Sequence, residues 1–344
     1  MSEPASGSAA AWEQAAAAGI HRLSIPTPFG IGRVNTYLIE DSPLTLVDSG
    51  PNSAKALDEL EQALAVHGHA VEDIELLVVT HQHMDHLGLL DSLARRSGAE
   101  VAVLDLLAPY VEAYAEWADR EDAFAQKMML AHGVPEDVVR VLRAVSSAFR
   151  AWGSSARVDR RLRAGERLRL ADRALDVLHR PGHSPTDTVL WDADRRLLLA
   201  ADHLIEHVSS NPLLSLPPGA DTAPVTWPER PQALVAYLAS LRATRELPAT
   251  LVLPGHGEPI VGHAALIDER LRLHDRRARK ILGLVRERPR SAYELAQEMW
   301  GNVAATQAYL TLSEVLGHLD LLIAAGRARE RSDDVLGIRF EPAG

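Results

Sequence analysis

The sequence contains no cysteine. Without cysteine a chain has no disulfide framework, no thiolate nucleophile and no thiolate ligand for a metal, so a bound metal must sit on histidine and carboxylate side chains. Basic residues are also in the minority, because 36 lysines and arginines stand against 47 aspartates and glutamates and give a formal net charge of −11. An acidic chain does not attract polyanions through its overall field, so nucleic acid is disfavoured as a partner.

Long hydrophobic runs are missing as well. No stretch reaches the ~18 uninterrupted apolar residues of a membrane span. The first 20 residues are rich in alanine, but they include Glu3 and Glu13 and no lysine or arginine, a pattern unlike a secretory signal. We therefore expect a cytoplasmic protein without membrane contact, with a flexible or loosely helical leader over residues 1–20.

What the chain does contain is an alternation of short apolar segments and amphipathic ones. Residues 34–40 and 44–48 predict a hairpin, and residues 54–66 predict a helix with leucines at helical spacing. Further strands are predicted at 75–80, 100–104, 166–171, 174–180, 187–191, 196–201 and 250–253, with a helix near 87–96. This order predicts an α/β fold with two sheets and helices outside them.

Residues 106–152 interrupt the alternation with two expected helices, separated near residues 133–135. The segment carries eight aromatic or methionine side chains: Tyr110, Tyr114, Trp117, Phe124, Met128, Met129, Phe149 and Trp152. Such side chains either line an apolar pocket or pack on the core and on each other. Both interpretations are open from the sequence.

After a boundary near residue 260, residues 261–344 predict three helices followed by two short strands, an order that resembles a winged-helix domain. DNA binding is the obvious inference from that resemblance. However, residues 287–344 hold six arginines against nine acidic residues, which is electrostatically poor for DNA. We expect a structural role for this unit, or one in forming a homodimer.

The most specific signal lies directly after the expected strand at 75–80. Its residues are Thr80-His81-Gln82-His83-Met84-Asp85-His86, in which three histidines and an aspartate fall within six positions. A loop at the end of a strand can turn all four side chains toward one point, and few roles other than metal binding need this set. Three more residues of ligand type follow later apolar runs: His183, Asp202 and His256.

These seven positions match the pattern of the metallo-β-lactamase superfamily, on the side of its glyoxalase II-like and lactonase-like members. The resemblance makes residues 21–260 the expected catalytic domain. It implies an αββα sandwich with His81, His83 and His183 on one metal ion, Asp85, His86 and His256 on the other, and Asp202 bridging both. Asp48, in Val47-Asp-Ser-Gly50, resembles the family's aspartate at the end of an early strand, which orients a ligand loop.

The expected chemistry follows from the ligand types. Imidazoles and carboxylates suit two zinc ions, with iron or manganese as alternatives. Two such ions share a hydroxide, which attacks a carbonyl or phosphoryl centre, and Asp85 is the candidate to carry a proton. The segment Leu87-Gly-Leu-Leu90 lacks the glycine pair of glyoxalase II and lactonases, so their specificity is not carried over. Antibiotic hydrolysis is not expected either, because β-lactamases with a cysteine ligand are excluded.

Two further segments leave alternatives open. Residues 140–173 hold ten arginines against three acidic residues, and this run either binds the phosphates of a coenzyme A thioester or a nucleotide or is a solvated face. Residues 206–212 follow Asp202 closely, so His207, Ser209, Ser210 and Asn211 either face the substrate or form a turn.

Three functions compete on this basis. The first is hydrolysis of an ester, thioester or lactone in a small-molecule substrate, with an anionic substrate left open. The second is a phosphodiesterase or ribonuclease of the same fold, which the arginine run would favour. The third is a winged-helix regulator that senses a metal and has no enzymatic activity. Complete metal ligation and the acidic charge favour the first.

Overall fold

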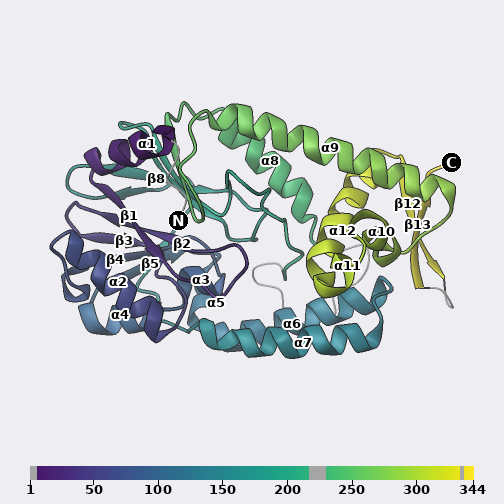
Figure 1. The fold of residues 1–344 in the computed structure, drawn as a ribbon, viewed down its shortest axis with the longest axis horizontal. Coiled ribbons are helices and arrows are strands. Elements are labelled where there is room, and N and C mark those ends of the chain that lie inside the picture. Colours follow the sequence, from purple (N-terminus) through teal and green to yellow (C-terminus); the bar gives the residue numbers. More distant parts are fainter. Residues whose placement is uncertain (1–5, 217–229, 334–336) are drawn as a thin grey trace.

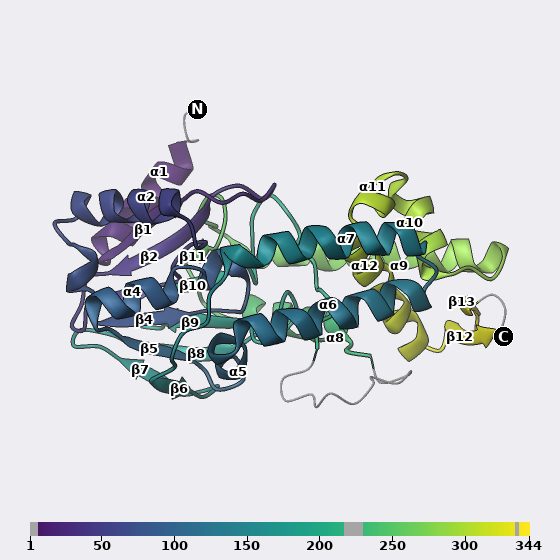
Figure 2. The same cartoon turned by 90° about the horizontal axis from the view of Figure 1, so that it is seen from below.

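The computed structural model describes residues 6–216, 230–333 and 337–344. Figure 1 shows a sandwich of sheets and helices at one end of the molecule and a helical unit with a small β-ribbon at the other. The same two parts are visible from below in Figure 2. The predicted α/β fold class is confirmed. The seven candidate metal ligands all lie in the sandwich.

The first sheet has six strands in the order β1-β2-β3-β4-β5-β6. They are β1 Ile20–Ile25, β2 Val34–Ile39, β3 Thr45–Val47, β4 Leu76–Val79, β5 Glu100–Leu104 and β6 Arg160–Leu162. The pairs from β1 to β3 are antiparallel and those from β3 to β6 are parallel. Parallel neighbours need crossover connections, which here run through α2 (Ala54–Val66) and α4 (Leu90–Ser97).

The second sheet has five strands in the order β11-β10-β9-β8-β7. They are β7 Arg167–Arg169, β8 Ala174–His179, β9 Thr188–Asp192, β10 Leu197–Ala201 and β11 Leu251–Pro254. In this sheet only the β10–β11 pair is parallel, and its crossover includes α8 (Ala233–Arg245). Backbone hydrogen bonds tie the two sheets together, from the Asn35 amide to the Gly255 carbonyl (2.7 Å) and from Thr188 to Thr80 (3.0 Å).

Alternation along the strands explains why helices cover the second sheet. Leu197 and Leu199 of β10 pack into the core between the sheets. Leu198 and Ala200 point the other way, into a second core shared with α8 and with α9 (His263–Glu287). Successive side chains of a strand face opposite sides, so a strand that is apolar throughout must be buried on both faces. This is the αββα arrangement.

The helical insertion predicted at 106–152 is present. It consists of α5 (Ala108–Glu112), α6 (Tyr114–Ala131), α7 (Glu136–Phe149) and the short helix η2 (Arg150–Trp152). A left-handed glycine at 133, with φ of 91°, turns the chain between α6 and α7. Figures 1 and 2 both show α6 and α7 lying side by side and reaching from the sandwich to the C-terminal helices.

The C-terminal part follows the predicted order of helices and a β-ribbon. After α9 come α10 Ala292–Trp300, α11 Val303–Thr306, α12 Ala308–Ala324, β12 Ala328–Asp333 and β13 Gly337–Pro342. Helix α10 begins at a capping box, in which Ser291 accepts from the Glu294 amide and the Glu294 carboxylate accepts from the Ser291 amide. Helix α12 contacts α8, α9, α10 and α6, so most of its side chains are buried. The winged-helix assignment stays a prediction.

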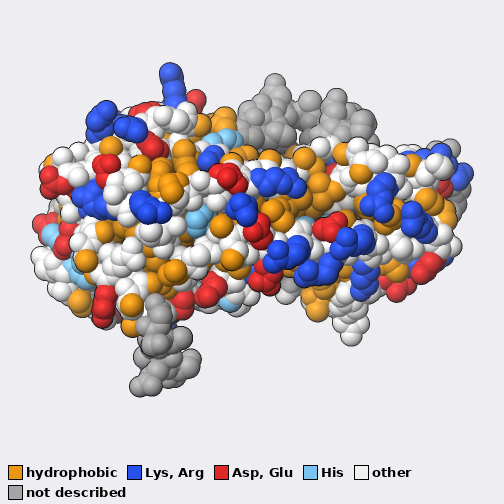
Figure 3. All heavy atoms as spheres, turned by 90° about the horizontal axis from the view of Figure 1, so that it is seen from above, with side chains coloured by type: hydrophobic (Ala, Val, Ile, Leu, Met, Phe, Trp, Pro, Cys, Tyr) orange, Lys and Arg blue, Asp and Glu red, His pale blue; other side chains and the backbone are white. Residues whose placement is uncertain are grey.

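The long helix α9 is one of the elements that bring charged side chains to the face seen from above. Figure 3 shows basic and acidic side chains intermixed on this face, along the length that α9 occupies in Figure 1. One such pair within the helix joins Arg279 to Asp275 (2.6 Å). The arginine-rich stretch of α9 is therefore interrupted by carboxylates on its outer side.

The N-terminal segment is helical and packed, where the sequence left a flexible or a loosely helical leader open. Residues 6–17 form α1, Ala11 and Ala15 are buried on the first sheet, and the Trp12 indole donates to Glu258 (2.9 Å). Small alanine side chains allow this helix to pack closely, and β1 already begins at Ile20. Residues 1–5 lie outside the described part. Among the described helices, none is long and apolar enough to cross a membrane.

The shorter helices complete the first layer. Helix η1 (Val71–Asp73) precedes β4, and α3 (Met84–Leu87) begins inside the histidine motif itself. Gly88 follows α3 in a crowded position, because an added Cβ would lie 2.3 Å from both the Asn52 amide nitrogen and the Trp152 carbonyl oxygen. Glycine at this position therefore lets α3 and η2 pack against each other.

Candidate metal centre

All seven residues singled out by the motif lie just beyond the ends of strands. His81, His83, Asp85 and His86 follow β4, His183 follows β8, Asp202 follows β10 and His256 follows β11. Because the two sheets are joined at this edge, the loops meet there. Their nitrogen and carboxylate atoms form three overlapping groups, with the atoms within each group lying within 4.8 Å of one another.

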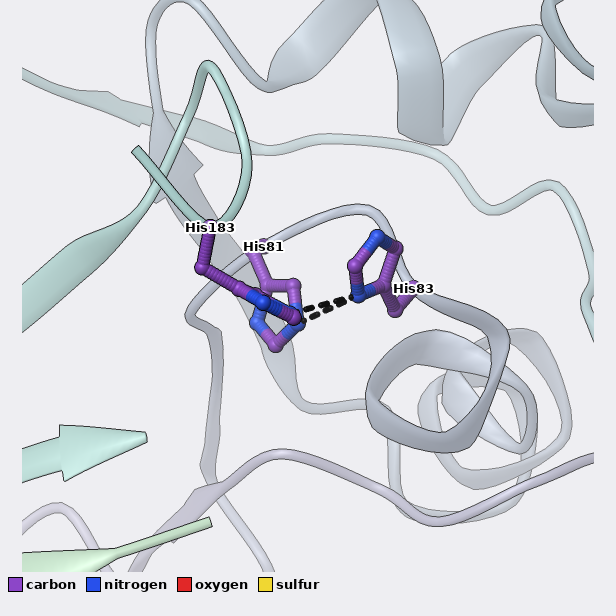
Figure 4. A group of neighbouring side chains, drawn as sticks. All are labelled: His81, His83 and His183. Carbon is purple, nitrogen blue, oxygen red and sulfur yellow. Dashed lines mark hydrogen bonds between the residues drawn. The ribbon is translucent and has the colours of Figure 1, made fainter. Parts of the chain in front are cut away.

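One group consists of His81, His83 and His183. The Nδ1 atom of His83 lies 3.1 Å from Nε2 of His81 and 2.9 Å from Nε2 of His183. Figure 4 shows the three rings converging from two loops, with these nitrogens pointing toward one another. Burial, and then the neighbouring His183, lowers the pKa of His83 to about 3. The imidazole is therefore neutral, as a metal ligand must be.

The second group contains Asp85, His86 and His256. Nε2 of His256 lies 3.4 Å from Oδ2 of Asp85 and 3.5 Å from Oδ2 of Asp202. Asp202 stands between the groups, since its carboxylate is also 3.5 Å from Nε2 of His86 and 3.6 Å from Nε2 of His183. Burial lowers the pKa of His86, but the Asp202 and Asp48 carboxylates outweigh burial and raise that pKa well above its usual value. The carboxylates thus create a site that favours a cation.

The far sides of the histidine rings are held by outer contacts. Asp48 is buried, and its Oδ2 lies 2.8 Å from Nδ1 of His86. Its carboxylate also accepts from the Thr80 amide (2.9 Å) and the Thr80 hydroxyl, which in turn lies 3.0 Å from Nδ1 of His81. Nδ1 of His256 lies 2.9 Å from the Arg33 carbonyl. Such contacts fix the ring orientation and the tautomer, which leaves each Nε2 free to bind a metal.

Three buried atoms at the centre of the cluster have no hydrogen-bond partner among the described residues: Nε2 of His86, Nε2 of His256 and Oδ1 of Asp202. Buried polar atoms are normally paired. The backbone also makes room for the cluster, because a Cβ added to Gly255 would lie 2.1 Å from Oδ1 of Asp202. Nitrogen and oxygen donors without sulfur, unpaired and pointing inward, fit divalent metal ions.

A cavity of about 290 Å³ opens beside His83. The insertion supplies part of its wall through Tyr110, Tyr114, Trp117 and Met129. For these four side chains, the interpretation that the insertion lines an apolar pocket applies. By contrast, Phe124 and Met128 pack into the hydrophobic core, in line with the other interpretation. Lining residues to which sequence reasoning gave no such role include Gln82, Met84, Glu121, Leu213, Ser215 and Tyr309.

Six of the ten arginines in the run at 140–173 pair with acidic residues, and four of those six do so with residues outside the run. Arg161 contacts Glu112 (2.9 Å), Arg167 contacts Asp176 (2.7 Å), and the buried Arg173 contacts Asp41 (3.1 Å). Arg143 and Arg150 line the cavity. The run therefore does not form a single basic patch of unpaired guanidinium groups.

Residues 206–212 are held by hydrogen bonds to other parts of the chain. Ser210 donates to the Asp202 carbonyl, Asn211 donates to the Leu310 carbonyl (3.0 Å), and the Ser209 hydroxyl lies 3.4 Å from His274. A Cβ on Gly257 would touch His207, so this ring packs against the loop after β11. Among the described residues that line the cavity, none comes from this segment.

The fold and the cluster define a class of protein. Residues 29–256 match the model of the metallo-beta-lactamase superfamily, and the chain belongs to that superfamily. It is a metallo-hydrolase by this membership, as the sequence resemblance predicted, and proteins of this superfamily bind divalent metals.

Particular relatives support the assignment. The chain is 34% identical over 302 residues to a Bacillus subtilis protein named "Probable metallo-hydrolase YqjP", covering 88% of this chain and 91% of that protein. It is 31% identical over 175 residues to the "Acyl-coenzyme A thioesterase MBLAC2" of Gallus gallus, covering 49% of this chain and 57% of that protein. A metallo-beta-lactamase family protein from Thermus thermophilus has a similar structure, with a TM-score of 0.76, 26% identity and coverage of 94% of this chain and 98% of that chain. A beta-lactamase domain protein from Burkholderia ambifaria has a TM-score of 0.79 and 27% identity, with coverage of 94% and 92%.

Proposed function

We propose that this protein hydrolyses an acyl ester, thioester or lactone with two divalent metal ions. The observation that carries the proposal is the convergence of seven histidine and aspartate side chains, three of whose buried ligand atoms lack a hydrogen-bond partner in the described part of the chain. His81, His83 and His183 would hold one ion, Asp85, His86 and His256 the other, and Asp202 both. Zinc suits this donor set best, with iron or manganese as alternatives.

When bound, such ions supply Lewis acidity and lower the pKa of a water from about 15.7 to about 7. The protein's own contribution is positional. Asp48, Thr80 and the Arg33 carbonyl hold the ligand rings, and Asp85, His86, Asp202 and His256 are buried. Asp85 is the proposed proton carrier, because its carboxylate lies at the cluster beside His256 (3.4 Å).

A carbonyl substrate is favoured over a phosphodiester by the surroundings of the cluster. The cavity beside His83 is walled largely by aromatic and aliphatic side chains, which suit an acyl group better than a polyanionic backbone. Most of the arginines that suggested phosphate binding are neutralised by carboxylates. The thioesterase named among the relatives supports a thioester in particular.

The test is a turnover assay of the zinc-loaded and manganese-loaded protein on an acyl thioester, an aryl ester, a lactone and bis(p-nitrophenyl) phosphate. His83→Ala and Asp202→Asn should retain less than ~1% of wild-type turnover, because even residues behind the ligands change affinity or activity 10–100-fold. Asp85→Ala tests the proton carrier. His69→Ala is the matched control, since His69 is partly exposed beside Glu40 and lies away from the cluster.

Metal-dependent cleavage of carbonyl substrates only, lost in the ligand variants, is the expected result. Cleavage of the phosphodiester alone would instead identify a phosphodiesterase. A gel shift at physiological salt addresses the regulator hypothesis, and we expect no DNA binding by the acidic C-terminal part. We also propose that the C-terminal part, from about residue 261, is a separate structural unit that forms a homodimer. Gel filtration of the whole protein measures its oligomeric state and so tests the dimer.

A further inference from the structure

The cavity beside His83 has three main walls, of which two come from the consecutive helices α6 and α7 and the third from segments much later in the chain. Helix α6 supplies one stripe at helical spacing, Ala118, Glu121, Ala125 and Met129. Helix α7 lies antiparallel to α6 and forms a second wall. The third wall comes from residues 213 and 215 and from Tyr309 at the start of α12. The C-terminal part thus contributes directly to the surroundings of the cluster.

The third wall is held in place by hydrogen bonds from both sides. Tyr309 donates its hydroxyl to the Leu214 carbonyl, and Ser313 accepts from the Leu214 amide (3.3 Å). On the other side, Tyr110 donates to the Leu216 carbonyl (2.7 Å), and Glu121 accepts from the Leu216 amide (3.0 Å). Residues 213–216 are therefore clamped between the insertion and α12. Such a wall keeps its shape in the absence of substrate.

The polar groups on the walls are largely paired with one another. Arg150 binds Asp119 and Asp122, Ser146 donates to Asp122 (2.6 Å), and Arg143 donates to Gln126. The hydroxyls of Tyr110 and Tyr309 are used by the backbone of residues 214–216. What remains for a ligand is mainly the apolar surface of the aromatic rings, Ala118, Ala125, Met129 and Leu142.

Size and shape narrow the ligand further. The stripe from Ala118 to Met129 runs for about 16 Å along α6, at 1.5 Å per residue, so the cavity is elongated. A volume of about 290 Å³ holds roughly ten groups of the size of a water molecule, at about 30 Å³ each. An elongated apolar space with one end at His83 fits a chain attached to a carbonyl group, and it does not fit a compact ring system.

We propose that this cavity binds the acyl chain of the substrate, an unbranched chain of roughly eight to ten carbons, and that α12 of the C-terminal part completes it. This proposal rests on the proposed acyl hydrolysis. It gives the C-terminal part a role in substrate selection. The chain would enter at His83 and extend along the groove between α6 and α7 toward Ala125 and Met129.

The first experiment measures kcat/KM for straight-chain acyl thioesters from two to sixteen carbons. Each methylene buried should raise kcat/KM about fourfold, the equivalent of ~0.8 kcal/mol, up to roughly eight to ten carbons, with a plateau or a fall beyond. In Ala125→Phe, the ring fills the distal half, so the ratio of the ten-carbon to the two-carbon value should fall at least tenfold. Ala123→Phe adds the same ring on the exposed face of the same helix and should leave the series unchanged. An equal response of the two variants would overturn the proposal.

A second readout does not depend on turnover. Trp117 lines the cavity and stacks on Tyr110 with ring centroids 4.3 Å apart, so an occupant should change tryptophan fluorescence. Titration with straight-chain alcohols should give a Kd that falls as the chain lengthens to about ten carbons. In Ala125→Phe the affinity should be at least tenfold weaker, and in Trp117→Phe most of the fluorescence change should be lost. Chain-dependent binding without acyl turnover would refute the hydrolysis and keep the chain site. Turnover without chain dependence in either readout would refute the chain site alone.

Discussion

Replacing Asp48 by asparagine tests whether the contacts behind the histidines control the metal centre. Asp48 has a φ of 61°, a left-handed conformation that asparagine also tolerates, so the backbone should not change. In the wild type, the Asp48 carboxylate accepts from the Thr80 amide and faces Nδ1 of His86 at 2.8 Å. Nδ1 therefore carries the proton, and Nε2 keeps its lone pair for a metal.

In the variant, the side-chain oxygen of the new asparagine still accepts from the Thr80 amide. Its NH₂ group then faces Nδ1 of His86, so two hydrogen-bond donors oppose each other. Either His86 moves its proton to Nε2 and loses the ligand lone pair, or the ring shifts. We expect affinity for the metal at His86 to fall 10–100-fold, about 1.4–2.7 kcal/mol of binding free energy. Zinc stoichiometry and affinity, measured by competition with a chromogenic chelator, report this change directly.

The matched control is Asp192→Asn. Asp192 is also a buried aspartate, but it pairs with Arg195 (3.3 Å) and Arg173 (3.8 Å), away from the cluster. Its replacement should lower stability without changing zinc affinity. If Asp48→Asn binds two zinc ions within twofold of the wild-type affinities, the reasoning about the His86 tautomer is wrong.

Three further predictions concern packing and burial. Gly255→Ala places a Cβ 2.1 Å from Oδ1 of Asp202, so we expect fewer than two zinc ions per folded chain by elemental analysis, and full occupancy would contradict this. Burial raises the pKa of Glu121 from 4.5 to about 8. Between these values, the folded chain keeps a proton that the unfolded chain loses, so wild-type stability falls as pH rises through this window. The difference in melting temperature between Glu121→Gln and the wild type should therefore shift in favour of the variant as the pH rises from 5 to 8.5. A difference that stays constant over this range would refute the protonated state of Glu121. Arg230→Met leaves Asp320 buried without its cation and should cost ~3–5 kcal/mol of unfolding free energy in urea, largely recovered in Arg230→Met/Asp320→Leu. A loss below ~1 kcal/mol would show that the pair contributes little.

The sequence already predicted much of the candidate centre, because metal ligation depends on residue type and local spacing. Four of the seven side chains lie within six positions, and a loop brings them together with little help from distant segments. His183, Asp202 and His256 each follow an apolar strand, and loops at the ends of neighbouring strands meet at one edge. The two-sheet fold was also predictable from the sequence. Strands that are apolar on both faces must be covered on both sides.

Other features had no reliable local signal. The alanine-rich start of the chain is helical because Ala11 and Ala15 pack on the first sheet and Trp12 reaches Glu258, a residue far along the sequence. The arginine run at 140–173 suggested an anion site. Its charge is cancelled by partners such as Asp41 and Glu112, which only the folded chain places beside it.

By itself, then, the sequence determined the superfamily, the sandwich and the seven residues that meet at its edge. The seven residues stand out through their types and short-range spacing, the superfamily and its αββα sandwich follow from the resemblance that these residues carry, and the two-sheet order is also visible in strand periodicity. Only the tertiary structure decided the cavity, because Glu121 and Tyr309 come together through the packing of α6 on α12. Contacts between distant helices depend on how whole surfaces fit, and no short pattern of residues encodes them.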